Sequence, residues 1–243
     1  MQLFLGENSM KKKLVAVLGI LLFSAMLTAC SGATKENVKV EEKPAEKGIL
    51  DGLTIVLDAG HGGFDIGTHG IATGVPESEV NLQIAKLLQN KLEEEGVDVV
   101  MTREGEDAIA GTKEEDMQKR ADIIRAAKAD IMISIHQNRY GDSDVYGPQV
   151  FYLMKQSKAE TLAQYMQEAL NNGLEIKKPR VPKNGEYKIL RPGTGPSIII
   201  ECGFLSNPRE DKLLQDPDYQ KKLVSAIIAG LKGFAEKNLE IDV

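Results

Sequence analysis

The sequence predicts an α/β fold: a single domain with a mainly parallel sheet of about six strands, flanked by helices on both faces. From position 52 onward, short apolar runs alternate with segments of helical periodicity, the order typical of βαβ units. The length of 243 residues suits one domain of roughly 150 to 200 residues with appendages. The chain contains no internal repeat and no long low-complexity tract, so a repeat architecture is excluded.

The first thirty residues predict a signal peptide. Three lysines, 11–13, precede an apolar run over 14–27 and then Thr28-Ala29-Cys30. The run is shorter than the roughly 20 residues that a membrane-spanning helix needs. The segment 27–30 resembles the bacterial lipobox, in which the cysteine is lipidated. We therefore expect export and a lipid anchor at Cys30 on the outer face of the membrane, with simple signal cleavage as the alternative.

Residues 31–50 alternate lysine with glutamate and predict a flexible charged linker, which leaves 51–238 as the folded domain. The chain carries a net charge of -6 and has no clustered basic segment, so nucleic acid is excluded as a partner. Once Cys30 carries a lipid, Cys202 is the single remaining thiol. No intramolecular disulfide is therefore expected.

The elements of the domain follow from periodicity and from start and stop signals. Strands are predicted at 54–58, 97–101, 131–135, 149–153, 187–190 and 197–201. Helices are predicted at 77–95, 115–128, 158–171 and 219–236, with a shorter one at 208–214.

Two of the three histidines lie at the ends of predicted buried strands: His61 follows the first strand and His136 follows the third. Ligands of open α/β sheets bind outside the carboxyl ends of the strands, so these side chains can converge. A single histidine would as readily be a hydrogen-bonded loop residue, but the pair favours a metal site. Asp58 or Asp65 could orient the ring of His61, or either could be a turn residue. His69 lies in a glycine-rich stretch and is interpreted as a rim residue.

Catalytic zinc takes three protein ligands as a rule, and Glu77 and Glu79 are the candidates for the third. Glu77 falls on the apolar stripe of its predicted helix, whereas Glu79 falls on the polar stripe. A buried carboxylate is costly unless it is paired or bound to a metal, so Glu77 is the expected ligand. The alternative is an acidic residue that stabilises the first turn of the helix.

Glu201 directly follows the last apolar strand, where a solvated charge is poorly placed. Beside a metal it could accept a proton from an activated water and return it to a leaving amine. The alternative is a structural salt bridge to Arg120 or Arg191. Cys202 could ligate zinc, but a small apolar residue is the commoner role at such a position.

Several ordered segments together resemble the zinc-dependent N-acetylmuramoyl-L-alanine amidases of bacterial cell walls. They are Leu57-Asp58-Ala59-Gly60-His61-Gly62-Gly63 with Asp65 and Gly67, Glu77-Ser78-Glu79-Val80-Asn81-Leu82, Thr102-Arg103, Ser134-Ile135-His136-Gln137-Asn138, and Ile200-Glu201-Cys202-Gly203-Phe204-Leu205-Ser206-Asn207. The resemblance implies zinc held by His61, Glu77 and His136, with Glu201 as the catalytic acid or base. It also implies the substrate: the amide that joins the lactyl group of N-acetylmuramic acid to L-alanine in peptidoglycan.

Within the family, the segment from Lys113 through Arg120 and the motif 201–204 are most similar to the germination-specific amidases, which help to form muramic-δ-lactam in spore cortex. One extra residue between His61 and Glu77, and Gln137 in place of a small or apolar residue, are departures expected to reshape the substrate groove. Asn138 and Arg120 are the candidate substrate contacts.

Three other functions remain open: a general autolysin, a zinc carboxypeptidase or endopeptidase acting on stem peptides, and a catalytically silent binding module. The four expected site residues are present, which disfavours the silent module. No separate peptidoglycan-binding domain is recognisable in the sequence, and an acidic enzyme should bind an anionic wall polymer weakly. We therefore expect a second exported protein or lipoprotein to assist it.

Overall fold

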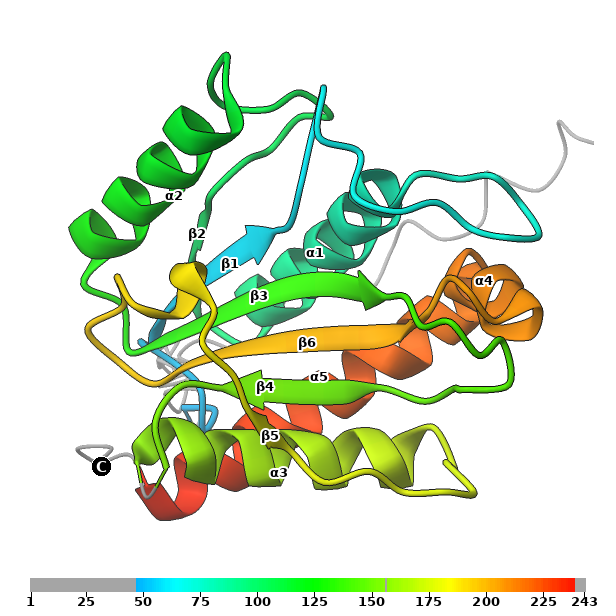
Figure 1. Cartoon of the computed structure of the whole chain (residues 1–243). Helices are drawn as coiled ribbons and strands as arrows, with labels where there is room; N and C mark the ends of the chain where they lie inside the picture. Colours follow the sequence, from blue (N-terminus) through cyan, green and yellow to red (C-terminus); the bar gives the residue numbers. More distant parts are fainter. Residues whose placement is uncertain (1–46, 156, 239–243) are drawn as a thin grey trace, which may run out of the picture. The chain divides into compact units, whose positions relative to one another are not determined.

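The computed structural model describes residues 47–155 and 157–238 (Figure 1). The predicted signal peptide, the lipobox with Cys30 and most of the linker lie outside the described residues. One boundary differs from expectation. Leu50 was assigned to the linker, yet it is fully buried and belongs to the main hydrophobic core. The packed domain therefore includes residues before 51.

A six-stranded sheet forms the centre of the domain, with the strand order β2-β1-β3-β6-β4-β5. The strands are β1 (Thr54–Ala59), β2 (Asp98–Met101), β3 (Ile131–Asn138), β4 (Gln149–Tyr152), β5 (Lys183–Asn184) and β6 (Ser197–Phe204). All neighbouring pairs are parallel except β4 and β6, which run antiparallel. The predicted α/β class and mainly parallel sheet are confirmed.

One predicted strand is wrong. Residues 187–190 do not form a strand: Lys188–Leu190 is the short 3-10 helix η1, and the sixth strand is instead the two-residue β5. Ile189 and Leu190 are buried because they pack from this turn against the second hydrophobic cluster. A short apolar run is compatible with a strand or a buried turn, and periodicity alone does not separate them.

Five α-helices complete the described domain: α1 (Glu77–Glu94), α2 (Lys113–Ala127), α3 (Lys158–Gly173), α4 (Pro208–Leu214) and α5 (Pro217–Asn238). α2 begins two residues before its predicted start because Thr112 caps it, accepting a hydrogen bond from the backbone N–H of Glu115. The other predicted helices match to within a few residues.

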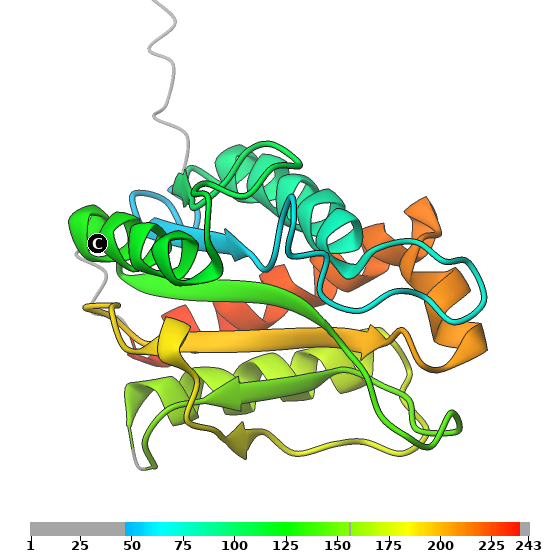
Figure 2. The same ribbon diagram turned by 45° about the horizontal axis from the view of Figure 1, so that its top comes forward.

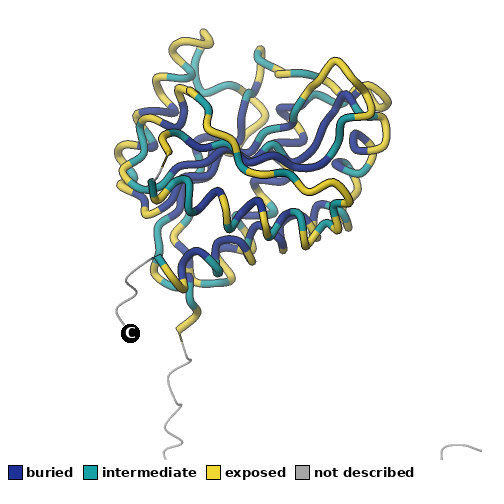
Figure 3. Tube along the Cα trace, turned by 60° about the horizontal axis from the view of Figure 1, so that its bottom comes forward, coloured by how far each residue is buried: buried dark blue, intermediate teal, exposed yellow. Residues whose placement is uncertain are grey.

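The helices cover both faces of the sheet, as predicted. Side chains of α1, α3 and α5 pack with alternate strand residues such as Ile55 and Leu57 in the larger core, and α5 passes behind β4 and β6 (Figure 1). The intervening residue Val56 points to the other face and packs with Ile124 of α2. Buried residues follow the strands through the domain (Figure 3). No helix among the described residues is long and apolar enough to cross a bilayer.

The topology brings three strand ends to one edge of the sheet. β1, β3 and β6 are parallel neighbours, so their carboxyl ends lie side by side (Figure 2). His136 of β3 and Glu201 of β6 are paired in register. This edge therefore carries the predicted site residues.

Candidate metal centre and active site

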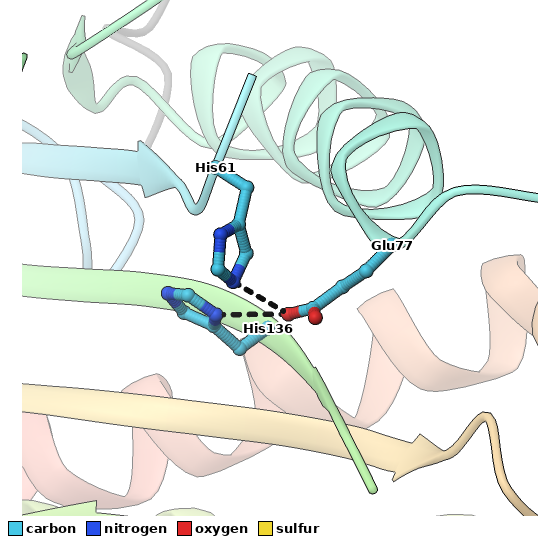
Figure 4. A group of neighbouring side chains, drawn as sticks. All are labelled: His61, Glu77 and His136. Atoms are coloured by element: carbon cyan, nitrogen blue, oxygen red, sulfur yellow. Dashed lines mark hydrogen bonds and ion pairs between the residues drawn. The ribbon is translucent and has the colours of Figure 1, made fainter. Parts of the chain in front are cut away.

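Three predicted ligands converge at this edge: His61 from the loop after β1, Glu77 from the first turn of α1 and His136 from β3 (Figure 4). Nε2 of His61 lies 3.3 Å from Oε1 of Glu77, and Nδ1 of His136 lies 3.0 Å from the same oxygen. The ligand atoms of the three residues all lie within 4.8 Å of one another. They are the only such group of three or more metal-ligating side chains in the described part of the chain.

The donor set fits a zinc ion. Zinc bonds of 2.0 to 2.1 Å in a tetrahedral arrangement place neighbouring ligand atoms about 3.3 Å apart. The two histidine–carboxylate distances are close to that value. Two imidazoles and one carboxylate are also a common protein set for catalytic zinc, which keeps a fourth position for water. His61, Glu77 and His136 could thus hold such an ion with little rearrangement.

Glu77 is 4% exposed, whereas Glu79 is exposed and hydrogen-bonded to Gln83. The Glu77 carboxylate accepts hydrogen bonds from the backbone N–H groups of Thr68 and Gln137, at 3.0 and 3.2 Å. Burial acts to raise the pKa of Glu77, but hydrogen bonds with the two histidines outweigh it and hold the pKa far below the usual range. The carboxylate is therefore ionised and ready to bind a cation.

Gln137 does not reshape the substrate groove, contrary to expectation. Its side chain is 3% exposed and donates to Oδ1 of Asn81, whose own amide donates to Oε1 of Glu77 and to the carbonyl of Gly60. Gln137 and Asn81 thus lie behind the ligand Glu77 and orient it.

His61 has an uncommon backbone conformation, with a φ of 62°. Its Nδ1 lies 3.0 Å from Oδ2 of Asp65, within reach of the carboxylate that was one of the two candidates to orient the ring. Gly60, the residue before His61, packs against the ring of His136 so closely that only glycine fits there: an added Cβ would lie 2.2 Å from the ring. The strained loop and the tight glycine together hold the two imidazoles in place.

Arg120 holds the loop that bears His61 through its backbone carbonyls. The side chain is 2% exposed, and it donates to Asp58, Asp116 and the carbonyls of Ala59 and His61, at 2.6 to 2.8 Å. With most of its donors satisfied within the protein, Arg120 supports the loop of His61, and this geometry disfavours the predicted substrate contact.

One expectation was that Asp58 orients the ring of His61, and the structure does not support it. The carboxylate of Asp58 binds Arg120 and accepts from the hydroxyls of Thr102 and Ser134, each at 2.6 to 2.8 Å. Burial acts to raise the pKa of Asp58, but Arg120 and the two hydroxyls together lower it. Asp58 therefore serves as the buried counter-ion of Arg120.

Arg103 is a site residue for which sequence analysis predicted no role. Its buried guanidinium donates to the carbonyls of Ala59, Gly60, Ser78 and Gly105, at 2.7 to 3.1 Å. It thereby ties the loop that bears His61 to the helix start that bears Glu77. A lone arginine after a short strand carries no pattern that predicts such bonds.

Glu201 lies close to the three ligands and lines a hollow of about 310 Å³, which His61 and His136 also line. The alternative salt bridge is absent from the described residues: Arg120 pairs with Asp58 and Asp116, and Arg191 pairs with Glu186. Oε2 of Glu201 is buried and has no hydrogen-bond partner there. Burial raises the pKa of Glu201 to about 7. A carboxyl group with this pKa can both accept and donate a proton near neutrality.

The remaining predicted residues lie around this centre. Asn138 is partly buried and accepts from the backbone N–H of Arg139, and nothing in the structure tests its predicted contact with substrate. His69 is exposed and lies outside the ligand group, and its predicted place at the rim of the site stays a prediction. Cys202 is fully buried in the main core, and burial raises the pKa of its thiol, so it behaves as a small apolar residue.

Comparisons with known proteins identify the family of the chain. The family model described as N-acetylmuramoyl-L-alanine amidase matches residues 55–233. The germination-specific N-acetylmuramoyl-L-alanine amidase of Bacillus subtilis is 38% identical over 197 residues, which are 77% of this chain and 82% of that protein.

Two solved structures extend the likeness to the fold. One contains the CwlD amidase from Clostridioides difficile in complex with the GerS lipoprotein; the match has 34% identity and a TM-score of 0.73, over 76% of this chain and 98% of that one. The other is an N-acetylmuramoyl-L-alanine amidase from Clostridium difficile, with 30% identity and a TM-score of 0.70 over the same shares. The chain belongs to the N-acetylmuramoyl-L-alanine amidase family and is an enzyme of that class.

Proposed function

We propose that the protein is a zinc-dependent amidase that hydrolyses the amide between the lactyl group of N-acetylmuramic acid and L-alanine of peptidoglycan. The observation that carries this proposal is the convergence of His61, Glu77 and His136 beside Glu201, whose Oε2 is buried and has no hydrogen-bond partner in the described part of the chain. Zinc held by the three ligands would polarise the scissile carbonyl and lower the pKa of a water molecule.

Glu201 handles the protons of the reaction. As the carboxylate, it takes a proton from the attacking water, whose oxygen bonds to the lactyl carbonyl carbon. It then gives that proton to the alanine nitrogen as the carbon–nitrogen bond breaks, so the products are a lactyl carboxylate and a free amine. The partly enclosed position of Glu201 favours this exchange, because few solvent molecules compete for its buried oxygen.

We further propose that the reaction serves formation of muramic-δ-lactam in spore cortex. The likeness to the germination-specific amidase of Bacillus subtilis supports this role over general autolysis. A zinc carboxypeptidase or endopeptidase that shortens the stem peptide is the alternative chemistry for the same set of ligands.

Products and matched variants test the proposal. The zinc-loaded protein, its Glu201→Gln variant and a Glu79→Gln control are incubated with defined muropeptides, and the products are identified by mass. We expect an intact stem peptide that begins with L-alanine from the wild type and the control. Glu201→Gln should lose at least about 100-fold in rate. A shortened stem peptide, or equal rates from wild type and Glu201→Gln, would contradict the proposal.

We also propose that the enzyme acts outside the cytoplasm, anchored by a lipid on Cys30, and that a second exported protein assists it. The cell-wall amidases among its relatives support action outside the cytoplasm, and the resemblance of residues 27–30 to a lipobox supports the anchor. The CwlD amidase solved in complex with a lipoprotein supports the assisting protein. A purified enzyme that binds zinc tightly and cleaves wall material at full rate alone would refute the need for a partner.

A further inference from the structure

The hollow that opens on the catalytic groups continues along α2. A second hollow of about 720 Å³ adjoins it, and the two share Lys113, Met117 and Lys188 in their walls. Both hollows lie between α2 and the segment around η1, and we call the adjoining pair the α2 groove. One end of the groove is the reaction centre with Glu201, and the other end lies beside Arg125 and Arg191.

The wall of the second hollow is rich in basic residues, although the chain as a whole carries a net charge of -6. This wall contains four cationic residues, Lys113, Lys188, Arg125 and Arg191, and one acidic residue, Glu114. This reversal of charge is local to the groove. A groove with this lining attracts an anionic group.

Lys188 is the cation in this set that is free to bind a ligand. Lys113 lies 2.9 Å from Asp65, Arg125 forms an ion pair with Asp122 on α2, and Arg191 forms one with Glu186 across η1. These two arginine pairs have side chains between 53% and 73% exposed, so they are weak and exchangeable. Lys188 is exposed and has no ion pair or side-chain hydrogen bond in the described part of the chain.

The backbone of Lys188 is fixed even though its side chain is free. It begins η1, and the two following residues, Ile189 and Leu190, are 6% and 5% exposed in the second hydrophobic cluster. The turn thus holds the backbone of Lys188 in the wall that both hollows share, within side-chain reach of a ligand in either hollow. A cation carried on a well-packed backbone is a feature expected of a specificity-determining residue.

We propose that the α2 groove holds the peptide half of the substrate and that Lys188 binds a carboxylate of that peptide, one or two residues beyond the alanine that is released. The inference rests on the proposed function, which places the scissile amide at Glu201. An extended peptide advances about 3.3 Å per residue, so a chain that leaves the reaction centre along the groove reaches the shared wall within a few residues. Lys188 should therefore distinguish a stem peptide with a free carboxylate from the same peptide with a carboxamide.

The first test compares two muropeptides that differ only in a carboxylate or a carboxamide on the residue after L-alanine. KM and kcat are measured for the zinc-loaded wild type, Lys188→Gln and the control Lys222→Gln, an exposed lysine on α5. We expect Lys188→Gln to raise KM for the carboxylate substrate roughly five- to tenfold. KM for the carboxamide substrate and kcat for both should stay within about twofold. Equal changes for both substrates, or no change, would overturn the inference.

A second test does not depend on cleavage. The free carboxylate stem peptide is titrated into the wild type and Lys188→Gln by calorimetry. A five- to tenfold weaker affinity in the variant supports the inference even if the protein cleaves a different bond. Two outcomes refute the inference: the peptide does not bind, or Lys188→Gln leaves its affinity unchanged. If the enzyme still cleaves the lactyl amide, the proposed function stays intact.

Discussion

Replacement of Arg120 by methionine should lower the free energy of unfolding by about 3 to 5 kcal/mol, the usual cost of leaving a buried charge without its partner. Methionine fills much of the same space, so the lost contribution is mainly electrostatic. Asp58, which is 2% exposed, would keep only the hydroxyls of Thr102 and Ser134. The buried carbonyl of Ala59 and the partly buried carbonyl of His61 would also lose a donor.

The assay is urea unfolding, with Arg125→Met as the matched control. Arg125 lies on the same helix and pairs with Asp122, but both side chains are more than half exposed, so its loss should cost at most about 0.5 kcal/mol. The pKa of Asp58 is lowered in the fold, so its stabilising pairing is present above about pH 4 and is lost in acid. The cost of Arg120→Met should shrink accordingly below that pH. A loss of unfolding free energy below about 1 kcal/mol near neutrality, or one equal to that of the control, would refute the view that the buried ion pair of Arg120 stabilises the fold.

Three further changes test the site itself. In metal-free protein, folding raises the pKa of Glu201 from 4.5 to about 7, so the wild type loses stability as pH rises through this range. Glu201→Gln should therefore be more stable than wild type by up to about 3 kcal/mol at pH 8 and equal to it near pH 4, and equal melting temperatures at pH 8 would contradict this. Glu77→Gln should weaken zinc binding by more than about 100-fold in calorimetry, and retained affinity would remove Glu77 from the ligand set. Gly60→Ala would place a Cβ 2.2 Å from the ring of His136 and should also weaken zinc binding, whereas Gly141→Ala, with open space around it, should not.

The sheet and its helices were predictable because burial and periodicity determine them. Strands such as 54–58 and 197–201 are near-continuous apolar runs, as expected for a sheet covered on both faces. The antiparallel direction of β4 was not predictable, because direction depends on how the chain returns to the sheet edge. The strand predicted at 187–190 failed for a related reason: its apolar residues are buried by a turn.

The candidate ligands were predictable because each follows a simple rule of position. His61 and His136 stand at strand ends, and Glu77 differs from Glu79 by its place on the apolar stripe of a helix. The supporting residues were not predictable in the same way. Arg103 and Arg120 act through backbone carbonyls, which every residue has, so no side-chain pattern in the sequence marks their partners.

The hydrogen-bond network behind Glu77 illustrates the same limit. Gln137 was interpreted as a change in the substrate groove, yet it lies on the opposite side of the ligand and contacts Asn81. Alternation along a strand predicts that His136 and Gln137 point to opposite faces. It does not reveal which polar group forms a hydrogen bond with the side chain of Gln137 on the inner face.

The most direct test of the central claim is hydrolysis of a defined muropeptide by the zinc-loaded enzyme in water enriched in ¹⁸O, with both products analysed by mass. Attack of water on the lactyl carbonyl predicts one ¹⁸O atom in the carboxylate of the N-acetylmuramic acid product, and an unlabelled stem peptide with a free alanine amine. A label in a carboxylate of the stem peptide, with the lactyl amide intact, would show a peptidase and contradict the account.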